Sequence, residues 1–447
     1  MNQVASTRTV PGRRGSVTPN RTVLIFAPLP AHAIARERIR FHPDPKREPR
    51  KAAAEKGRKI MVLDGVRVID LTTVVAGPLA SLILAQQGAE VIKVEPPAGD
   101  LIRRLGYIAG DGASSTHHVL GRGKTLISLD LTDASGRGAL HRLLGDADIL
   151  LHNYRPGVAE RLGLDPDELQ ARYPRLIVGE VTGFGSEMPL RDVRAYDPVI
   201  QAESGLAARP GDEDPALYPQ YICDKVSGLY LCQAVTAALA ARATTGKGKR
   251  VEVSMLEAAT AFAWMDVHMP LTLADPVRPG PNIAKVYRPW KAKDGWFVVV
   301  MLSEKEFGGW CEAVEALDLL EDERCADMAS RFLNWDTIRE RCEPNVASLS
   351  VETVLARLRE KGVPAGKVNT SEDMLTHPQL LNSGFLYEAD GGKAGRLRLP
   401  ASPARFDGER PGLNAVAGSA IGQDTRTLLQ ASGFDDDEIA TLTGAGA

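Results

Sequence analysis

The stretch VRVIDLTTVVAGPLASLILAQQGAEVIKVE, residues 66–95, decides the fold of this chain. Two runs rich in Val and Ile flank an apolar stretch of helical length, which predicts a strand, a helix and a second strand. Glu95 closes the second strand, at the place where dinucleotide-binding proteins hold a ribose. Such proteins also carry G-x-G-x-x-G in the first turn, whereas this turn holds the single glycine Gly77. The stretch therefore indicates a unit built like a dinucleotide site but made for another ligand.

The same alternation of strands and helices continues to about Ala258. Helical stretches at 135–144 and 167–173 separate three further runs of Val, Ile and Leu, namely TLISLDL, DILLHNY and RLIVGEVTGFG. Strands of this composition are typical of parallel sheets covered on both faces, which predicts a doubly wound α/β fold. A long helix is expected to follow Asp224 and to end near Gly246.

The composition sets three other parts of the chain apart from 61–270. Residues 1–60 hold 14 Lys or Arg, 4 Asp or Glu and seven prolines, which predicts a disordered extension; a targeting segment or a start at Met61 would also fit. A Pro-rich stretch then opens a second unit, 271–390, and residues 391–447 return to strand and loop before a last helix. The second unit is expected to hold a strand and two helices, at 296–302, 304–316 and 351–361. The last helix is expected around 425–430.

Charge, hydropathy and cysteine usage exclude several classes of protein. A net charge of -3 does not favour nucleic-acid binding, which usually needs a basic face to displace phosphate counterions. No apolar run approaches the roughly 18 residues that span a bilayer, so no membrane association is expected. Five scattered cysteines without a C-x-x-C pair predict a reducing, cytoplasmic setting. The histidines show no metal-ligand spacing, so no metal is expected.

Two basic motifs are candidates for phosphate contacts. HVLGRGKT, residues 118–125, nearly matches a P-loop, but His118 stands in place of the first glycine. It is more simply a basic loop entering a strand, in which Lys124 could meet a phosphate as a point charge. GDLIRR places Arg103 and Arg104 just beyond the second strand. They are either a solvated pair or a phosphate contact, because ligands of open α/β sheets bind beyond the carboxyl ends of the strands.

Two aspartates stand at points where a carboxylate can act. Asp224 lies at the head of the long helix, where it is expected to cap the free N–H groups of the first turn. The same position is expected to keep the carboxylate ionised and fixed in direction, as a nucleophilic Asp requires. The sequence does not separate the two roles. Tyr196 and Asp197 follow the glycines of a loop after a strand, which by itself is an ordinary turn.

Taken in order, a set of sequence blocks resembles the family III CoA-transferases, which include the α-methylacyl-CoA racemases. The blocks are DLTTVVAGPLAS, GAEVIKVEPPAGD, HNYRPGVAERLGL, VTGFG with RAYDPVIQAESGL, CDKVSGLYLCQAVTAALAARATTGKGKRVEVSM and GQDTRTLL. They extend over roughly residues 61–440, and the ordered set is far more specific than any single block.

The resemblance implies a fold and an activity. A Rossmann-like large domain would form from 61–270 and 391–447, with 271–390 as a smaller α/β domain and two chains interlocked as a homodimer. The reaction would move CoA from an acyl-CoA thioester to a carboxylic acid, with these two small molecules as partners and no permanently bound cofactor. The family's catalytic carboxylate maps onto Asp224, which would form an acyl-aspartyl anhydride and then an aspartyl-CoA thioester.

The resemblance also implies a CoA site. The loop 73–76 would offer backbone contacts, Arg103 would meet phosphate, and Tyr196 would lie beside the reacting thioester as a second catalytic residue. The full set of implied CoA contacts is Thr73, Val74, Val75, Ala76, Arg103, Arg104, Lys124, Asn153, Tyr154 and Arg161.

The chain departs from two branches of the family. The formyl-CoA transferase branch has Gln where this chain has Val75, Arg where it has Pro96, and a glycine-rich loop not found in this sequence. Formate and oxalate are therefore not favoured as substrates. The racemase branch has His where Tyr196 stands, and a phenol is a poorer base than imidazole at neutral pH. Transfer is the favoured activity, with a racemase and a non-catalytic CoA-binding protein as alternatives.

Overall fold

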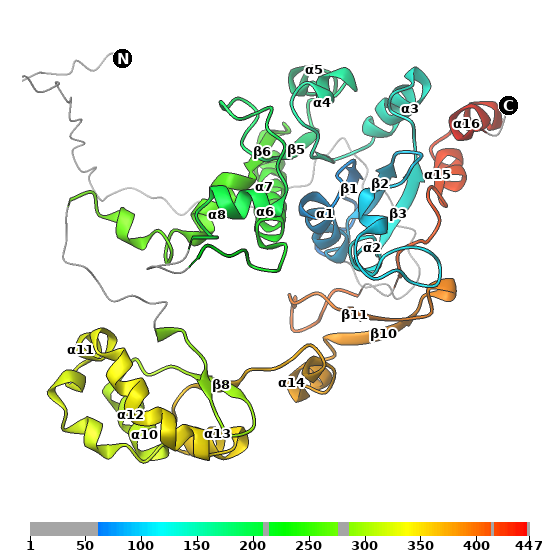
Figure 1. The fold of residues 1–447 in the computed structure, drawn as a ribbon. Helices are drawn as coiled ribbons and strands as arrows, with labels where there is room; N and C mark the ends of the chain where they lie inside the picture. The colour runs from blue at the N-terminus through cyan, green and yellow to red at the C-terminus, as the bar shows by residue number, and fades with distance from the viewer. Residues whose placement is uncertain (1–60, 209–213, 276–285, 413–414, 445–447) are drawn as a thin grey trace, which may run out of the picture. The chain divides into compact units, whose positions relative to one another are not determined.

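The computed structural model describes residues 61–208, 214–275, 286–412 and 415–444 (Figure 1). Its first sheet holds six parallel strands in the order β3-β2-β1-β4-β5-β6. These strands are β1 (Arg67–Asp70), β2 (Glu90–Glu95), β3 (Lys124–Ser128), β4 (Ile149–His152), β5 (Ile177–Thr182) and β6 (Arg250–Ser254). The order is that of a doubly wound Rossmann sheet, and it reverses between β1 and β4. The predicted α/β class is confirmed, whereas the predictions for 1–60 lie outside the described residues.

Helices connect these strands, and their ends follow local sequence signals. Asp165 accepts hydrogen bonds from the N–H groups of Asp167 and Glu168 and so caps α5, which has Pro166 at its first position. The long helix α7 ends at Gly246, whose φ of 71° is the left-handed conformation that glycine adopts without strain. The segments are α1 (Ala76–Gln86), η1 (Leu101–Arg104), α2 (Ser115–Leu120), α3 (Ala134–Leu144), α4 (Val158–Arg161), α5 (Pro166–Arg172), α6 (Asp197–Glu203), α7 (Ile222–Thr245), α8 (Met255–Ala263) and η2 (Met269–Thr272).

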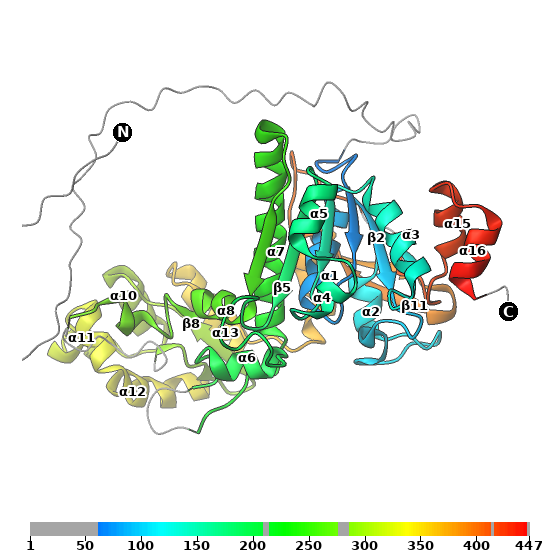
Figure 2. The ribbon, with the colours of Figure 1, turned by 90° about the horizontal axis from the view of Figure 1, so that it is seen from above.

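Two glycines allow α1 to lie close to its neighbours. A Cβ at Gly77 would stand 2.3 Å from the side chain of Thr72, so this glycine of the first turn is required by packing. A Cβ at Gly228 of α7 would stand 2.4 Å from the carbonyl oxygen of Ala76. Gly228 therefore lets α7 run beside the start of α1, as Figure 2 shows.

The expectation that no segment has the length and composition to span a membrane is not met by helix α7. With 24 residues it is long and apolar enough by length and composition to do so. Its apolar side chains, among them Val226, Leu231 and Val235, are buried against α1, α8 and the strands β5 and β6. This is the packing of a core helix, which needs the same apolar composition.

The middle of the chain forms a second sheet with its own core. Strand β8 pairs antiparallel with β7 and with β9, and the buried Trp290, Phe297 and Trp310 pack together beside it. A capping box of Ser303 and Glu306 begins α10. The elements are β7 (Trp290–Lys291), β8 (Trp296–Val299), α10 (Glu304–Ala313), η3 (Leu317–Leu320), η4 (Glu323–Cys325), α11 (Met328–Leu333), α12 (Trp335–Ser348), α13 (Val351–Glu360) and β9 (Ala365–Lys367).

The last part of the chain contacts the first sheet. The backbone N–H of Leu126 in β3 donates to Asp424, and that of Ser128 donates to Thr425. Leu429 and Ile439 join the same buried cluster as Ile127, so residues from both ends of the described chain share one core. The elements are η5 (Asp373–Leu375), α14 (Pro378–Asn382), β10 (Leu386–Asp390), η6 (Gly392–Ala394), β11 (Arg396–Pro400), α15 (Thr425–Ala431) and α16 (Asp436–Thr443).

The close approach of α7 to α1 yields a stability prediction. We expect Gly228→Ala to lower the free energy of unfolding by about 1–3 kcal/mol, because the added methyl group must push α7 away from Ala76. The control is Gly138→Ala in α3, where a Cβ would meet nothing within 4 Å and alanine is the better helix former. Denaturant unfolding of both variants measures the difference. Equal stability of the two variants would contradict the proposed packing.

Candidate active site

The loop between β1 and α1 is held by side chains from several strand ends. The N–H of Thr73 donates to Oδ1 of Asn153 at 2.9 Å, and Nδ2 of Asn153 donates back to the carbonyl of Thr73 at 2.9 Å. Asn153 follows β4, so this pair joins the two strands between which the sheet order reverses. Ligands of open α/β sheets bind at this switch point. Two of the predicted CoA contacts are therefore brought together where a ligand is expected.

Val74 occupies a strained backbone conformation in the same loop. Its φ of 68° lies in the left-handed region, which β-branched side chains rarely adopt. Its N–H donates to Oδ1 of Asp100 at 3.2 Å. Strained residues of this kind gather at functional sites, where the surrounding structure holds them in place.

A buried cluster of charges lies between the sheet and α1. Asp70 is fully buried, and its carboxylate contacts Nζ of Lys124 at 3.2 Å and Nζ of Lys93 at 4.0 Å. Burial would raise the pKa of Asp70, but the two ammonium groups, together with hydrogen bonds from Ser81 and Thr72, outweigh burial and hold this pKa below its ordinary value. Burial lowers the pKa of Lys124 to about 8. Thr72 is bound to this cluster as well, because its N–H donates to Asp70 and its carbonyl accepts from Lys93.

Two of the predicted phosphate contacts are engaged inside the protein. Lys124 also donates to the Pro78 carbonyl and to Ser81 of α1, and 1% of its side chain is exposed. Arg103 makes two hydrogen bonds to the carboxylate of Glu95, at 2.8 and 2.7 Å. Each of these two cations is paired with a buried acid, Lys124 with Asp70 and Arg103 with Glu95. The expectation that Lys124 lies near a CoA phosphate stays a prediction.

The remaining predicted CoA contacts lie at or near the surface. Arg104 is exposed and makes one long hydrogen bond to the Ala98 carbonyl, and Arg161 is exposed at the end of α4. Tyr154 is partly buried and stacks on His152, with the ring centres 6.0 Å apart. These side chains could contact a nucleotide, Arg104 and Arg161 through charge and Tyr154 through its ring.

The start of α1 offers backbone donors. Val75 is the N-cap residue and provides no side-chain hydrogen bond to the first turn, which also lacks an acidic residue. The side chains of Val75 and Ala76 are buried, so these two residues can contact a ligand through backbone groups alone. Free N–H groups and the positive end of the helix dipole favour an anionic or electron-rich ligand group.

Asp224 lies one helical turn before Gly228, on the same face of α7. Gly228 lies against the carbonyl of Ala76, so Asp224 stands one turn before the point at which α7 approaches the start of α1. The side chain is 9% exposed. Asp224 is thus a shielded carboxylate on the part of α7 that approaches α1.

Asp224 is not the helix cap that its sequence position predicts. The N-cap of α7 is Tyr221, and the acceptor is Asp197 of α6, whose Oδ2 binds the N–H of Asp224 at 3.0 Å. Burial and the neighbouring charge of Asp197 raise the pKa of Asp224 to about 7. The expectation that this position keeps the Asp224 carboxylate ionised is therefore wrong for the single chain. There the protonated form of Asp224 is favoured below about pH 7.

Tyr196 is the N-cap residue of α6 and precedes the capping Asp197. Its side chain is 58% exposed. Its backbone position is fixed near α7 by Asp197, which bonds both α7 and Gln201.

The sequence reasoning missed three residues of this region. Asp70 and Lys93 are charged residues next to the apolar runs of β1 and β2, which is a signal of a buried ion pair. Asp100 follows Gly99 in the turn after β2 and caps η1. Their partners could not be inferred, since the contacts join separate parts of the chain.

Comparison with known proteins identifies relatives along most of the chain. The family model described as CoA-transferase family III matches residues 63–425. The chain is 32% identical to the probable fatty acyl-CoA transferase Rv3272 of Mycobacterium tuberculosis over 77% of its own length and 91% of the relative's. It is 32% identical to the acetyl-CoA:oxalate CoA-transferase of Acetobacter aceti, with 78% and 91% covered. A CAIB/BAIF family protein from Brucella suis has a similar structure, with a TM-score of 0.73, 28% identity, and 84% and 100% covered.

The raised pKa of Asp224 predicts how stability depends on pH. The unfolded chain ionises near the ordinary value of 3.8 and the folded chain near 7, so folding favours the protonated acid. The free energy of unfolding of the wild type should therefore fall, relative to that of Asp224→Asn, as the pH rises from about 4 through 7. The difference in free energy of unfolding should reach about 4 kcal/mol at pH 8, since one pKa unit corresponds to about 1.4 kcal/mol.

Denaturant unfolding at several pH values measures this difference. Asp437→Asn is the control, because Asp437 also lies in the first turn of a helix but is exposed. A difference between wild type and Asp224→Asn that stays constant from pH 4 to pH 8 would refute the raised pKa.

Proposed function

The chain belongs to CoA-transferase family III, and from this premise we propose that it transfers CoA between an acyl-CoA thioester and a carboxylic acid through covalent intermediates on Asp224. CoA transfer is the activity of the family and of its named relatives. The donor, the acceptor acid and the course of the reaction are the proposed part. The acyl-CoA thioester and the carboxylic acid are substrates, and the proposed reaction requires no permanently bound cofactor.

The observation that carries the proposal is the placement of Asp224. Its carboxylate is shielded from water, lies one turn before the point at which α7 approaches the start of α1, and has a pKa of about 7. A nucleophile with this pKa is ionised in a large fraction of molecules at neutral pH. Shielding matters because an anhydride intermediate would hydrolyse in open water.

The proposed reaction has four steps, and each forms one bond and breaks one. An Asp224 oxygen attacks the donor thioester carbon, the C–S bond breaks, and an acyl-aspartyl anhydride and CoA thiolate result. The thiolate attacks the aspartyl carbon, which releases the donor acid and leaves an aspartyl-CoA thioester. The acceptor carboxylate attacks that thioester and again releases thiolate, giving a second anhydride. The thiolate attacks the acceptor carbonyl, so product acyl-CoA leaves and Asp224 is restored.

We assign the other predicted residues to binding. The backbone of Thr73, Val74, Val75 and Ala76 would line the pantetheine arm, with Asn153 fixing this loop. Arg104 and Arg161 are the exposed cations for phosphate, and Tyr154 offers a ring to the nucleotide. Arg103 would act through the loop it anchors to Glu95. Tyr196 would lie beside the thioester, since its neighbour Asp197 caps the helix that carries Asp224.

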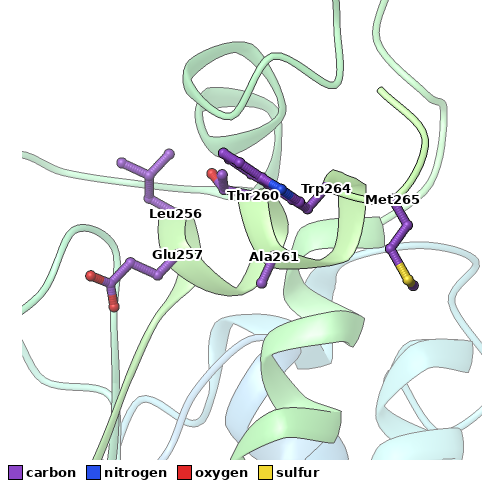
Figure 3. Close-up of a pocket in the computed structure, with 6 residues that line it drawn as sticks. All are labelled: Leu256, Glu257, Thr260, Ala261, Trp264 and Met265. Carbon is purple, nitrogen blue, oxygen red and sulfur yellow. The ribbon is translucent and has the colours of Figure 1, made fainter. Parts of the chain in front are cut away.

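We further propose that two chains interlock as a homodimer, with 61–270 and 391–447 as the large domain and 271–390 as the small one. Exposed apolar surface on α8 and the following turn supports this. A groove of about 620 Å³ lies over Thr260, Trp264 and Met265, shown in Figure 3, and 82% of Met265 is exposed. Apolar patches of this kind mark interaction surfaces. Sedimentation of the chain as a monomer would contradict this assembly.

The activity is tested with a panel of acyl-CoA donors and carboxylic acids in deuterated water, followed by mass spectrometry of the CoA products. We expect new acyl-CoA species without α-deuterium. Asp224→Ala should abolish transfer and still bind CoA, because the carboxylate is the nucleophile rather than a binding group. Deuterium at the α-carbon without CoA exchange would instead indicate a racemase, and near-normal turnover of Asp224→Ala would remove this residue from the mechanism.

The covalent course is tested with an acceptor acid labelled with oxygen-18 in its carboxylate. In the proposed steps one acceptor oxygen stays on the aspartate when product acyl-CoA forms. After turnover, the peptide with Asp224 should carry at least one heavy oxygen, and the peptide with Asp197 should carry none. Direct exchange between acid and thioester leaves both peptides unlabelled, and that result would exclude the anhydride.

A further inference from the structure

In the loop that precedes α1, the backbone groups of Thr72, Thr73 and Val74 are each hydrogen-bonded to a side chain from another part of the site. Thr72 is bound by Asp70 and Lys93, and Thr73 is bound by Asn153. Val74 alone has the left-handed conformation, with a φ of 68°, and Asp100 is the acceptor for its N–H. A β-branched residue leaves this conformation unless a contact holds it there. The hydrogen bond to Asp100 is therefore the contact that keeps the middle of the loop in place.

Asp100 is itself fixed on both sides. Its Oδ2 lies 3.2 Å from Nζ of Lys93, and its own N–H donates to Glu95 at 3.2 Å. The residue is 2% exposed, so water does not compete for its carboxylate. The same Oδ1 that accepts from Val74 also caps η1 at Ile102. Asp100 thus links the ion cluster under α1 to the strained residue of the loop.

We propose that Asp100, held by Lys93, is a positioning residue that keeps Val74 in its left-handed conformation and so shapes the loop for acyl-CoA. This inference rests on the proposed function, because it takes loop 73–76 as the CoA contact. Asp100 is too deeply buried to meet CoA and acts through the Val74 backbone. Its loss should therefore weaken CoA binding and leave the chemistry on Asp224 intact.

The test is a double-mutant cycle of Asp100→Ala and Val74→Gly in the full chain. CoA affinity is measured by calorimetry, and kcat and KM are measured in the transfer assay. Asp100→Ala should raise Kd for CoA and KM for acyl-CoA about tenfold, which corresponds to about 1.4 kcal/mol, with kcat changed less than about twofold. In the Val74→Gly background, Asp100→Ala should raise Kd for CoA and KM for acyl-CoA less than about threefold, because glycine adopts a positive φ without being held.

A purely structural role for Asp100 predicts a different result. If Asp100→Ala acts only by removing the cap on η1, it should raise Kd for CoA by the same factor with valine or glycine at position 74. Equal factors in these two backgrounds would therefore overturn the proposal. Asp165→Ala is the matched control, because it removes the Asp cap of α5 without touching the loop, and it should leave Kd unchanged. If Asp100→Ala does not fold, Asp100→Asn tests the Lys93 pairing in the same cycle, because it keeps an acceptor for Val74 but loses the charge that binds Lys93. Kd for CoA should rise with Val74 present and rise less beside Val74→Gly, and an equal rise in both backgrounds would overturn the proposal.

Wild-type behaviour separates this proposal from the proposed function. A chain that binds CoA but shows no transfer would refute the function, while the cycle on CoA affinity would still decide the role of Asp100. A chain that binds no CoA would overturn both.

Discussion

The buried contact of Asp70 with Lys93 and Lys124 is the constraint on which the site depends. All three side chains are almost completely removed from water, so each charge is tolerable only while its partners stay in place. The cluster joins β1, β2 and β3 to α1 through Ser81 and to the loop through Thr72. Moving any one of these strands would separate a buried charge from a partner. These contacts therefore hold β1, β2 and β3 in place relative to α1 more rigidly than apolar packing alone, which tolerates small shifts.

The position of Asp224, the proposed nucleophile, follows from a second contact, Gly228 against the carbonyl of Ala76. This contact sets the distance between α7 and α1, and through it the place of Asp224 one turn away. Asp197 then serves two purposes, since it bonds the first turn of α7 and raises the pKa of Asp224 by its charge. In the proposed function, capping and catalysis are divided between two aspartates. An ordinary cap needs only a fully ionised carboxylate, whereas a carboxylate that must attack a thioester is a stronger nucleophile when it is less strongly stabilised as an anion.

The sequence predicts the strands β1 to β5 and the helices α3, α5 and α7 because their apolar periodicity and end signals are local. It also places Thr73 and Asn153 in one site, through resemblance to a family. It does not predict that Arg103 and Lys124 are occupied by Glu95 and Asp70, since these pairs form through tertiary packing. For the same reason the cap on α7 is misassigned: the acceptor, Asp197, lies 27 residues before the N–H it binds. Charged residues within apolar strands signal a buried partner but do not say which one.

The missing glycine pattern in the first turn has a physical counterpart in Val74. In a dinucleotide fold, glycine adopts the unusual backbone conformation freely, and the ligand then orders the turn. Here a β-branched residue adopts a positive φ and is held by Asp100, so the loop is ordered before any ligand arrives. Ordering a loop in advance lowers the entropy that binding must remove. In the proposed cycle CoA thiolate is freed and captured again twice, so a site that keeps its shape throughout is an advantage. Such a site requires restraint rather than glycine.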